Sequence, residues 1–282
     1  MKCKFCHHDE AHPVDRIPSP HLPQRYTLYG CPACGSRFFD LAEHPVDLEA
    51  IYEKLSMGHA DRNFSRFKER FYWRRQVGRI RKILGAMPDS VLDVGCRNGE
   101  FLEHFPEEVE RVGIELSEHS VRNARAKGLT VYQDYAENID FTEPFHCVTN
   151  YALVEHLADP VVFLDRIGRL VRPGGLLVIL IPTAQCLKRL YLDNRRGRVW
   201  KMYSPPEHLN YLSRRFLDSH LRSRGFTLAG RYYGSGGVVS LPGFLRPLKP
   251  LAVGSLMLLD EYTPLSRIPI FDHMYSYYRK TG

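Results

Sequence analysis

The sequence predicts an α/β protein with a doubly wound, Rossmann-like sheet of seven strands and a small cysteine-rich module at the N-terminus. Strands and helices alternate along residues 90–235, which is typical of parallel strands joined by helices on both faces of a sheet. Residues 1–45 differ, since they are rich in cysteine, histidine and proline and show little apolar periodicity. Such a short segment needs a cross-link or a metal ion to hold it together. We therefore expect two structural units of unequal size.

Apolar runs and capping residues place the elements of the larger unit. Strands are expected at 90–95, 111–116, 129–133, 146–151, 175–182 and 226–233, and helices at 99–105, 117–128, 160–171 and 212–225. The run 175–182 is almost continuously apolar, as a strand buried on both faces should be. Ser117 and Ser213 are the expected N-caps of two of these helices, which Gly128 and Gly225 end.

Composition and spacing assign the flanking segments. We divide the chain into a cysteine module (1–45), a helical linker or lid (46–88), the α/β domain (89–235) and a C-terminal cap (236–282). Two apolar faces at helical spacing support the linker: Leu48, Ile51, Tyr52 and Leu55, then Val77, Ile80, Ile83 and Leu84. The run HMYSYYRK at 273–280 is expected to form a last strand at the edge of the sheet.

Hydropathy excludes an integral membrane protein. The 282 residues are 44% hydrophobic, but no run approaches the ~20 apolar residues of a transmembrane helix. The N-terminus lacks the apolar stretch of a signal peptide, so we expect a cytoplasmic protein with reduced cysteines. The apolar runs near 241–259 fit a substrate lid, a dimer contact or a membrane-surface patch, and the sequence does not rank these.

Much of the formal charge of +7 lies in two segments, 62–82 and 195–224. Such runs are usually solvated helix faces. They also suit a phosphate-bearing partner, either a nucleic acid or a nucleotide-linked small molecule. Both interpretations stay open at this point.

Four cysteines form two pairs at the spacing of a metal site. Cys3 and Cys6 make one CxxC pair and Cys31 and Cys34 the other, with 24 residues between the pairs. Two such pairs match a tetrahedral thiolate site for structural Zn²⁺, with no open position for catalysis. The segment resembles a zinc ribbon whose hairpin strands are RYTLYGC and SRFFDL. Such ribbons bind nucleic acid, contact another protein or cover a substrate site, and the sequence does not choose.

The stretch VLDVGCRNGEF at 91–101 runs from a strand into a glycine-bent loop. Ligands of doubly wound sheets bind beyond the carboxyl ends of the strands, and glycines there let the backbone come close to a ligand. The loop matches neither G-x-G-x-x-G nor a P-loop. Glu115, at the end of the next strand, is placed to accept hydrogen bonds from two ribose hydroxyls.

A set of five motifs is more specific than any one of these residues. In order, they are LDVGCRNGEF, GIELS, QDYAENIDF, VEHLADP and LVRPGGLLVILIP. Together they resemble the class I S-adenosylmethionine-dependent methyltransferases over roughly residues 88–233. The segment 204–226 is similar to the small-molecule and glycan-pathway members of that superfamily.

The resemblance implies a cofactor site made of Asp93, Gly95, Cys96, Arg97, Gly99, Glu115, Leu116, Asp134, Tyr135, Asn150 and Tyr151. In it, Asp93 and Gly95 lie under the methionine part of S-adenosylmethionine, and Glu115 binds the ribose. Leu116 packs on the adenine, Asp134 accepts from the adenine amino group beside Tyr135, and Asn150 and Tyr151 face the methyl donor.

Arg97 departs from the family pattern, which has glycine at this position. Its side chain would either crowd the cofactor or pair with the methionine carboxylate, and we favour the pairing. An arginine that points to solvent is the simpler alternative. Cys96 and Cys147 are better explained as small packing residues than as nucleophiles.

Three residues are candidates for acid–base work on the methyl acceptor. His156 and Glu155 follow the fourth strand, and His208 lies in PPEHLNY before the sixth. Either histidine suits a general base, with Glu155 to assist. Related enzymes with a similar EH stretch hold a divalent metal there, but they carry an acid where this chain has Ala152, so we expect no second metal site.

The resulting hypothesis is a methyltransferase that modifies a hydroxyl or a carbon of a small molecule, such as a sugar or nucleotide-sugar. The stretch NYAL at 150–153 lacks the Pro-Pro-aromatic motif of many enzymes that methylate exocyclic amines of bases. The alternatives are an RNA methyltransferase, which grips RNA with the ribbon and the basic segments, and a non-catalytic binding scaffold.

Overall fold

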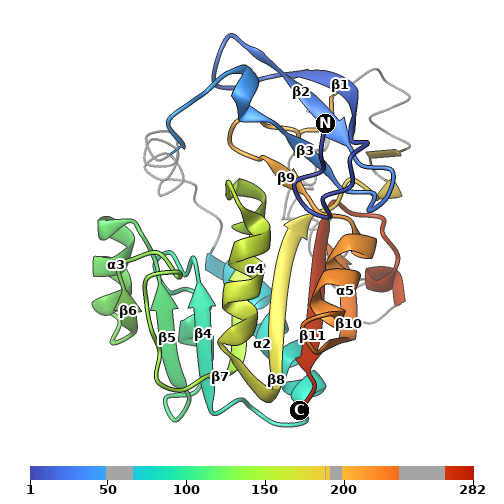
Figure 1. The fold of residues 1–282 in the computed structure, drawn as a ribbon. Helices are drawn as coiled ribbons and strands as arrows, with labels where there is room; N and C mark the ends of the chain where they lie inside the picture. Colours follow the sequence, from blue (N-terminus) through green and yellow to red (C-terminus); the bar gives the residue numbers. More distant parts are fainter. Residues whose placement is uncertain (49–65, 188, 191–198, 235–263) are drawn as a thin grey trace, which may run out of the picture.

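The computed structural model describes residues 1–48, 66–187, 189–190, 199–234 and 264–282 (Figure 1). A seven-stranded sheet forms the body of the molecule, and a smaller sheet lies above the carboxyl ends of its parallel strands (Figure 1). The apolar face expected at 48–55 and the runs near 241–259 fall largely or wholly outside the described residues. Among the described residues, no helix is both long and apolar enough to cross a bilayer.

The large sheet has the strand order β10-β11-β8-β7-β4-β5-β6. Its strands are β4 (Ser90–Val94), β5 (Glu110–Ile114), β6 (Thr130–Tyr132), β7 (Phe145–Tyr151), β8 (Val171–Pro182), β10 (Phe226–Gly234) and β11 (His273–Lys280). The five strands from β8 to β6 are parallel, and β11 is antiparallel to both of its neighbours. The predicted doubly wound, seven-stranded sheet is confirmed.

The position predicted for the last strand was wrong. Strand β11 lies inside the sheet between β8 and β10, and β10 is the edge strand. Burial explains the order, because Met274, Tyr275, Tyr277 and Tyr278 are all at most 2% exposed. Strand β10 has exposed or half-exposed residues along most of its length, as an edge strand can.

Helices cover both faces of this sheet (Figure 1). They are α2 (Arg66–Leu84), α3 (Glu118–Arg125), α4 (Pro160–Arg169) and α5 (Arg214–Arg222). Apolar residues of α2 and α3 pack with one face of the strands, and those of α4 and α5 pack with the other. In β8, Leu177 and Ile179 join the α4–α5 core, whereas Leu176 and Val178 join the α2–α3 core. This explains its continuous apolar run.

The two N-cap predictions are confirmed, but α3 and α5 end at Arg125 and Arg222, before Gly128 and Gly225, and one predicted helix is wrong. The hydroxyls of Ser117 and Ser213 accept hydrogen bonds from the first turns of α3 and α5. The helix expected at 99–105 is only a 3₁₀ turn, η2 (Leu102–His104). Pro106 follows directly, and the residue before a proline is driven into extended backbone, which ends the turn at Phe105.

The N-terminal sheet has the strand order β1-β2-β3-β9. Strands β1 (His12–Pro18), β2 (Arg25–Gly30) and β3 (Arg37–Phe39) include the predicted hairpin, and a 3₁₀ turn, η1 (Leu41–Glu43), follows. The fourth strand, β9 (Asn210–Tyr211), comes from the segment just before α5. The cysteine module is therefore joined by backbone pairing to the later part of the chain.

Gly99 is required by packing. Its φ is +76°, and a Cβ there would lie 2.2 Å from the Leu129 side chain. We expect Gly99→Ala to lower the free energy of unfolding by about 2–5 kcal/mol, from left-handed strain plus overpacking. Gly128→Ala is the matched control, because its φ is +78° but nothing lies within 4 Å of the new Cβ. Urea unfolding of both variants measures the difference, and equal losses would contradict the packing explanation.

Candidate functional site

The loop after β4 is shaped by its backbone. The amides of Gly95 and Cys96 both donate to the carbonyl of Ile114, at 2.8 and 3.1 Å. Gly95 and Arg97 both have left-handed φ, +82° and +51°. Left-handed backbone explains why glycine suits position 97. The Arg97 side chain is exposed, and the side chain of Cys96 is buried against Gly113.

Glu115 holds this loop to the end of β5. One carboxylate oxygen accepts from the Arg97 amide at 2.9 Å, and the other accepts from the amides of Leu116 and Ser117 at 2.9 Å. A carboxylate has about four acceptor sites, so capacity remains for a ligand hydroxyl. The sequence suggested a ribose-binding role for Glu115 but gave no sign that its carboxylate also organises the glycine loop.

Asp93 is buried beneath the loop, with 4% of its surface exposed. Its carboxylate accepts a 2.6 Å hydrogen bond from the Thr149 hydroxyl on β7. Burial raises the pKa of Asp93 to about 7, and the Thr149 hydrogen bond opposes that rise. A nearby positive charge stabilises the ionised form of such a buried carboxyl group, so Asp93 favours a ligand that brings positive charge.

The ends of β5 and β6 carry exposed apolar side chains. Leu116, Tyr132 and Tyr135 are 50%, 42% and 44% exposed. Asp134 accepts hydrogen bonds at 2.7 Å from the Tyr135 amide and the Asn138 side chain. The arrangement offers apolar surface for a flat ring next to a carboxylate that accepts hydrogen bonds.

The end of β7 carries buried polar atoms that have no hydrogen-bond partner. Asn150 donates to the Val94 carbonyl at 3.0 Å, but its side-chain oxygen is unpartnered. The Tyr151 ring contacts Trp73 of α2 and Phe101, with ring centres 5.2 and 5.0 Å apart. The Tyr151 hydroxyl and the Trp73 indole N–H are also buried without partners. Sequence analysis missed Trp73, because it lies in a segment noted only for its charge.

The three acid–base candidates lie together beyond β7. Glu155 and His156 are in the 3₁₀ turn η3 (Val154–His156), and one ligand atom from each of Glu155, His156 and His208 lies within 4.8 Å of the others. The two imidazole rings meet edge to face, with centres 4.7 Å apart. The sequence predicted no second metal site here, because Ala152 replaces an acidic ligand. In the structure, His208 comes from a distant part of the chain and supplies a third possible metal ligand beside Glu155 and His156.

Backbone carbonyls fix both histidines. His156 Nδ1 lies 2.7 Å from the Glu207 carbonyl, and His208 Nδ1 lies 3.0 Å from the Met202 carbonyl. A carbonyl only accepts, so each neutral ring carries its proton on Nδ1 and has its lone pair on Nε2. Burial lowers the pKa of His208, against the opposing charge of Glu207, so this ring is neutral at pH 7.

Glu155 is the most unusual member of this cluster. Its side chain is 2% exposed, and one carboxyl oxygen is buried without a partner. Burial raises the pKa of Glu155 from 4.5 to about 8, so the group is mostly protonated at pH 7. A neutral carboxyl group next to two basic nitrogens suits proton transfer or ligand orientation.

Comparison with known proteins identifies the domain that carries these groups. A family model described as a methyltransferase domain matches residues 64–229. The chain belongs to this family. Residues 64–229 therefore form a methyltransferase domain, and the methyltransferase resemblance inferred from the five motifs is confirmed.

Curated relatives and solved structures agree at the level of the domain. An ubiquinone biosynthesis O-methyltransferase from Mesorhizobium japonicum is 36% identical over 98 residues, 32% of this chain and 39% of the relative. One from Alkalilimnicola ehrlichii is 33% identical over 106 residues, 34% and 43% of the two chains. The chain thus spans about two fifths of the length of these relatives.

Two solved structures share the fold. The plantazolicin methyltransferase BpumL, in complex with SAH, matches with a TM-score of 0.55 and 14% identity over 81% of this chain and 90% of that chain. An S-adenosylmethionine-dependent methyltransferase from Thermotoga maritima matches with a TM-score of 0.53 and 17% identity over 84% and 100%. At these identities the likeness concerns the fold alone.

The residues present fit the cofactor of this family. Asp93 offers a buried carboxylate, and the unpartnered atoms of Asn150, Tyr151 and Trp73 lie at the carboxyl edge where such a ligand binds. Buried polar atoms without partners are costly, and a ligand bound at this edge would give these three atoms partners.

The four cysteines lie together as their spacing predicted. One sulfur from each of Cys3, Cys6, Cys31 and Cys34 lies within 4.8 Å of the others. Cys3 and Cys34 have sulfurs 3.9 Å apart, and Cys6 and Cys31 have sulfurs 3.6 Å apart. Tetrahedral Zn²⁺ with bonds of about 2.3 Å would separate its sulfurs by about 3.8 Å. The donor set fits structural zinc.

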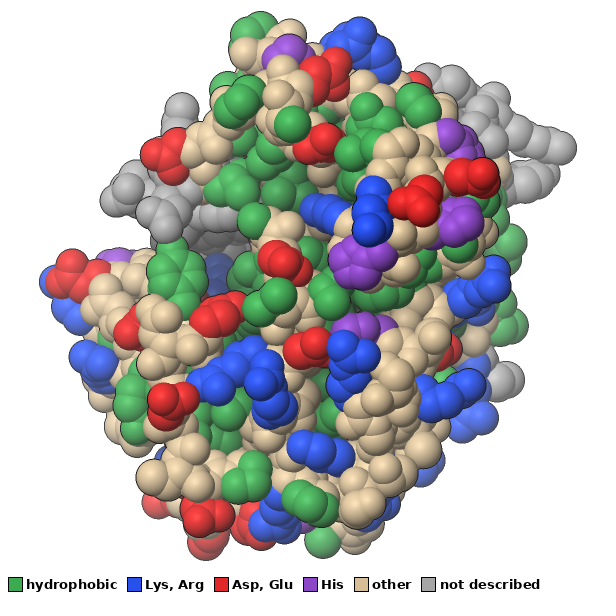
Figure 2. All heavy atoms as spheres, in the orientation of Figure 1, with side chains coloured by type: hydrophobic (Ala, Val, Ile, Leu, Met, Phe, Trp, Pro, Cys, Tyr) green, Lys and Arg blue, Asp and Glu red, His purple; other side chains and the backbone are tan. Residues whose placement is uncertain are grey.

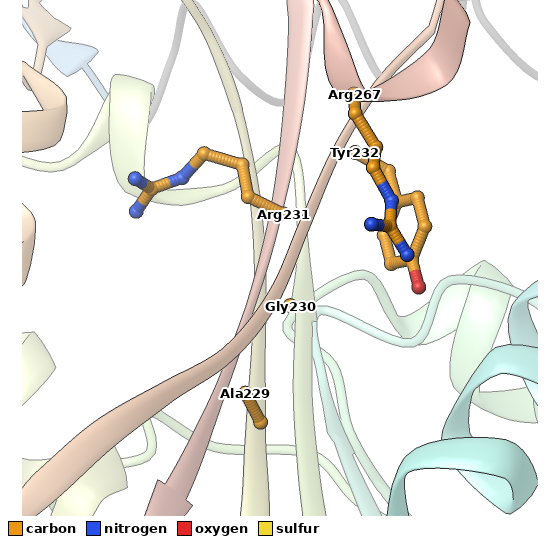
Figure 3. A pocket seen from close by; sticks show the side chains of 5 residues that line it. All are labelled: Ala229, Gly230, Arg231, Tyr232 and Arg267. Carbon is orange, nitrogen blue, oxygen red and sulfur yellow. The ribbon is translucent and has the colours of Figure 1, made fainter. Parts of the chain in front are cut away.

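A hollow of about 220 Å³ lies against β10 (Figure 3). Ala229, Gly230, Arg231, Tyr232 and Arg267 line it. Arg231 points away from Tyr232 and Arg267 and pairs with Asp218 at 2.6 Å (Figure 3). None of the lining residues is a candidate cofactor or acid–base residue, so this hollow is not the candidate active site.

Some basic side chains of the two basic segments make contacts with other parts of the same chain. The Arg79 guanidinium lies 4.0 Å from the centre of the Tyr232 ring, and Arg224 pairs with Asp165 at 2.9 Å. On the face shown in Figure 2, basic and acidic side chains of the described residues are interspersed. These contacts favour the interpretation of the segments as ordinary helix faces.

The Glu155 proton makes stability depend on pH. The folded chain holds this proton up to about pH 8, whereas the unfolded chain loses it near pH 4.5. The contribution of this proton to the free energy of unfolding is fully present below pH 4.5 and is lost as the pH rises to 8. In the wild type, the free energy of unfolding should therefore fall by about 2–5 kcal/mol between these pH values, at about 1.4 kcal/mol per pH unit. We expect this fall to be absent in Glu155→Gln. Urea unfolding at several pH values measures this, with the exposed Glu107→Gln as control. Parallel curves for wild type and Glu155→Gln would contradict a neutral Glu155.

Proposed function

We propose that the protein transfers a methyl group from S-adenosylmethionine to a hydroxyl oxygen of a small molecule. The observation that carries this proposal is the pair of carbonyl-anchored histidines beside Glu155, just beyond the end of β7. A hydroxyl acceptor must lose a proton, and a neutral imidazole is suited to take it. The curated relatives are O-methyltransferases by name, which supports oxygen over carbon as the acceptor atom. Sugars and nucleotide-sugars are among the acceptors to screen.

The proposed reaction needs few protein groups. S-adenosylmethionine, when bound, supplies a methyl group already activated by the positive sulfonium. The acceptor oxygen forms the new bond to carbon as the carbon–sulfur bond breaks, and its proton passes to Nε2 of His208. His156 packs against His208 and fixes the ring, and the protonated Glu155 offers a hydrogen bond to the acceptor. Most of the remaining rate enhancement comes from alignment.

Each cofactor residue has a proposed role that its surroundings support. Asp93 attracts the cationic end of S-adenosylmethionine, and Gly95 and Gly99 shape the loop beneath it. Glu115 accepts from the ribose hydroxyls with its remaining acceptor capacity, while Leu116, Asp134 and Tyr135 surround the adenine. Asn150, Tyr151 and the Trp73 indole N–H supply polar atoms next to the methionine part. Arg97 pairs with the methionine carboxylate.

The role of Arg97 can be separated from general binding. We expect Arg97→Ala to weaken S-adenosylmethionine binding about tenfold, because a charge-assisted pair is lost. Binding of methylthioadenosine, which has no carboxylate, should not change. Calorimetric titration of both ligands measures this, with the exposed Arg122→Ala of α3 as control. Equal losses for both ligands would show that Arg97 acts on the loop and not on the carboxylate.

The role of Asp93 is tested by the same titration. Asp93→Ala should abolish measurable S-adenosylmethionine binding, because the cationic ligand loses its only buried carboxylate partner among the proposed contacts. Wild-type binding in the micromolar range is expected. Absence of binding by the wild type would overturn the proposed function as a whole.

The proton acceptor is tested by substitution of His208. His208→Gln should lower kcat at least about 100-fold, the usual size of a general-base contribution, with the affinity for S-adenosylmethionine unchanged. Because burial lowers the pKa of His208, the wild-type rate should stay high at pH 6.5 and fall only in more acidic solution. His156→Gln is the comparison variant and should lose less. A larger loss in His156→Gln would transfer the base to that ring.

The two alternative functions, an RNA methyltransferase and a non-catalytic binding scaffold, are tested by a screen for the methyl acceptor. A labelled methyl donor is offered with small-molecule and RNA fractions at 50 and 200 mM salt. Transfer to RNA that weakens steeply with salt would overturn the small-molecule proposal. Tight cofactor binding without transfer to any fraction would favour the scaffold.

A further inference from the structure

The cysteine module and the histidine cluster are connected by one short segment, residues 204–213. On its module side, β9 pairs with β3, so that Arg37 faces Tyr211 and Phe38 faces Asn210. The Phe39 amide also donates to the Leu209 carbonyl at 3.0 Å. The segment thus continues the sheet of the cysteine module.

The same segment is tied to the second cysteine pair itself. The Ser213 amide donates to the Ser36 hydroxyl at 3.0 Å, and the Ser213 hydroxyl donates to the Cys34 carbonyl. Ser36 and Ser213 are buried, at 0% and 3% exposure. Since the Ser213 hydroxyl also caps α5, the turn around Cys34 fixes the point where the segment enters that helix.

On its other side the segment holds the turn that carries Glu155 and His156. The Leu209 amide donates to the Glu155 carbonyl at 2.7 Å, and the Asn210 side chain donates to the Val154 carbonyl at 3.0 Å. The Glu207 carbonyl anchors His156, and His208 lies in the segment itself. Residues 207–210 therefore hold the turn of Glu155 and His156 and carry His208, whose ring the Met202 carbonyl anchors.

The module also reaches the cluster from the side. His21 lies 3.2 Å from the Glu207 carboxylate, which also accepts from the Ser204 hydroxyl at 2.8 Å. Phe39, Trp200, Tyr203 and Tyr211 fill the space beneath in a shared apolar core. The contacts run without a break from the cysteines to the proposed proton acceptor.

We propose that the metal-loaded cysteine pairs position the acid–base cluster, so that zinc controls methyl transfer but not cofactor binding. The inference rests on the proposed function. Strands of three and two residues are too short to hold their register alone, so the β3–β9 junction needs the fixed turn next to it. The hydrogen bonds of the loop after β4 and of Glu115 run to β5, β6 and α3, apart from this junction.

Zinc removal from the full-length protein tests the coupling. Chelator-treated and zinc-reloaded protein are compared by amide hydrogen exchange and by titration with S-adenosylmethionine. Without zinc, the Leu209 and Tyr211 amides should exchange at least about tenfold faster, as expected for local opening. The Gly95 and Cys96 amides and the cofactor affinity should change less than about twofold. Unchanged exchange at Leu209 would overturn the proposal.

A buried hydroxyl provides a variant that keeps the cysteines and the α5 cap. Ser36→Ala removes the acceptor of the Ser213 amide and also a hydroxyl that hydrogen-bonds to the Cys34 thiol. We expect a loss of about tenfold in kcat, since small misplacements of reacting groups are costly. Its zinc content and cofactor affinity should match the wild type. Ser90→Ala is the matched control, because its buried hydroxyl likewise accepts from a backbone amide, that of His146, at 3.0 Å near the opposite end of the sheet.

The outcomes distinguish this inference from the proposed function. If Ser36→Ala loses no more kcat than Ser90→Ala, the coupling is wrong, while methyl transfer by wild type still supports the proposed function. Ser213→Thr, which keeps the hydroxyl, should preserve turnover where Ser213→Ala does not. If Ser213→Thr loses as much turnover as Ser213→Ala, the hydrogen bond to the Cys34 carbonyl is not the cause of the loss in turnover.

Discussion

The parallel pairing of β4 with β5 on one side and β7 on the other is the constraint on which the rest of the structure depends. This register puts Asp93 beside Gly113 and Thr149, and it ends the three strands at one edge. The glycine loop, Glu115 and Asn150 then meet there because the strands that carry them end at the same edge. Since helices cover both faces, a ligand of such a sheet is expected at this edge and its loops.

The edge carries two carboxyl groups whose burial raises their pKa values, Asp93 and Glu155. In a purely structural role both would be liabilities, because burial without a charged partner is costly. A site for a positively charged methyl donor changes this balance at Asp93, where the ligand itself brings the opposite charge. At Glu155 the proton stays on the carboxyl group, so the cost of an ionised buried group is avoided. Burial of a carboxyl group thus serves two different purposes, one at Asp93 on β4 and the other at Glu155 beyond β7.

The sequence predicted best the features that local chemistry determines. Strand periodicity, the serine caps and the CxxC spacing depend on neighbouring residues, and each is confirmed. Features that depend on distant parts of the chain were missed or misplaced. The position of β11 is decided by pairing with β8, about a hundred residues earlier, and Trp73 reaches Tyr151 from a helix whose sequence shows mainly charge. No local pattern announces such contacts.

The contact between His156 and His208 depends on distant parts of the chain, and it shows why the cysteine module matters. The two rings are carried by segments that no strand of the large sheet holds together. What brings them together is the run 207–210, and that run is ordered by pairing with β3 of the module. In the proposed arrangement, the small sheet of the module holds this run, while β4 and β5 hold the cofactor side. In this arrangement the module forms part of the site, and the order of the chain, with the cysteines first and the histidines far behind, hides a single structural unit.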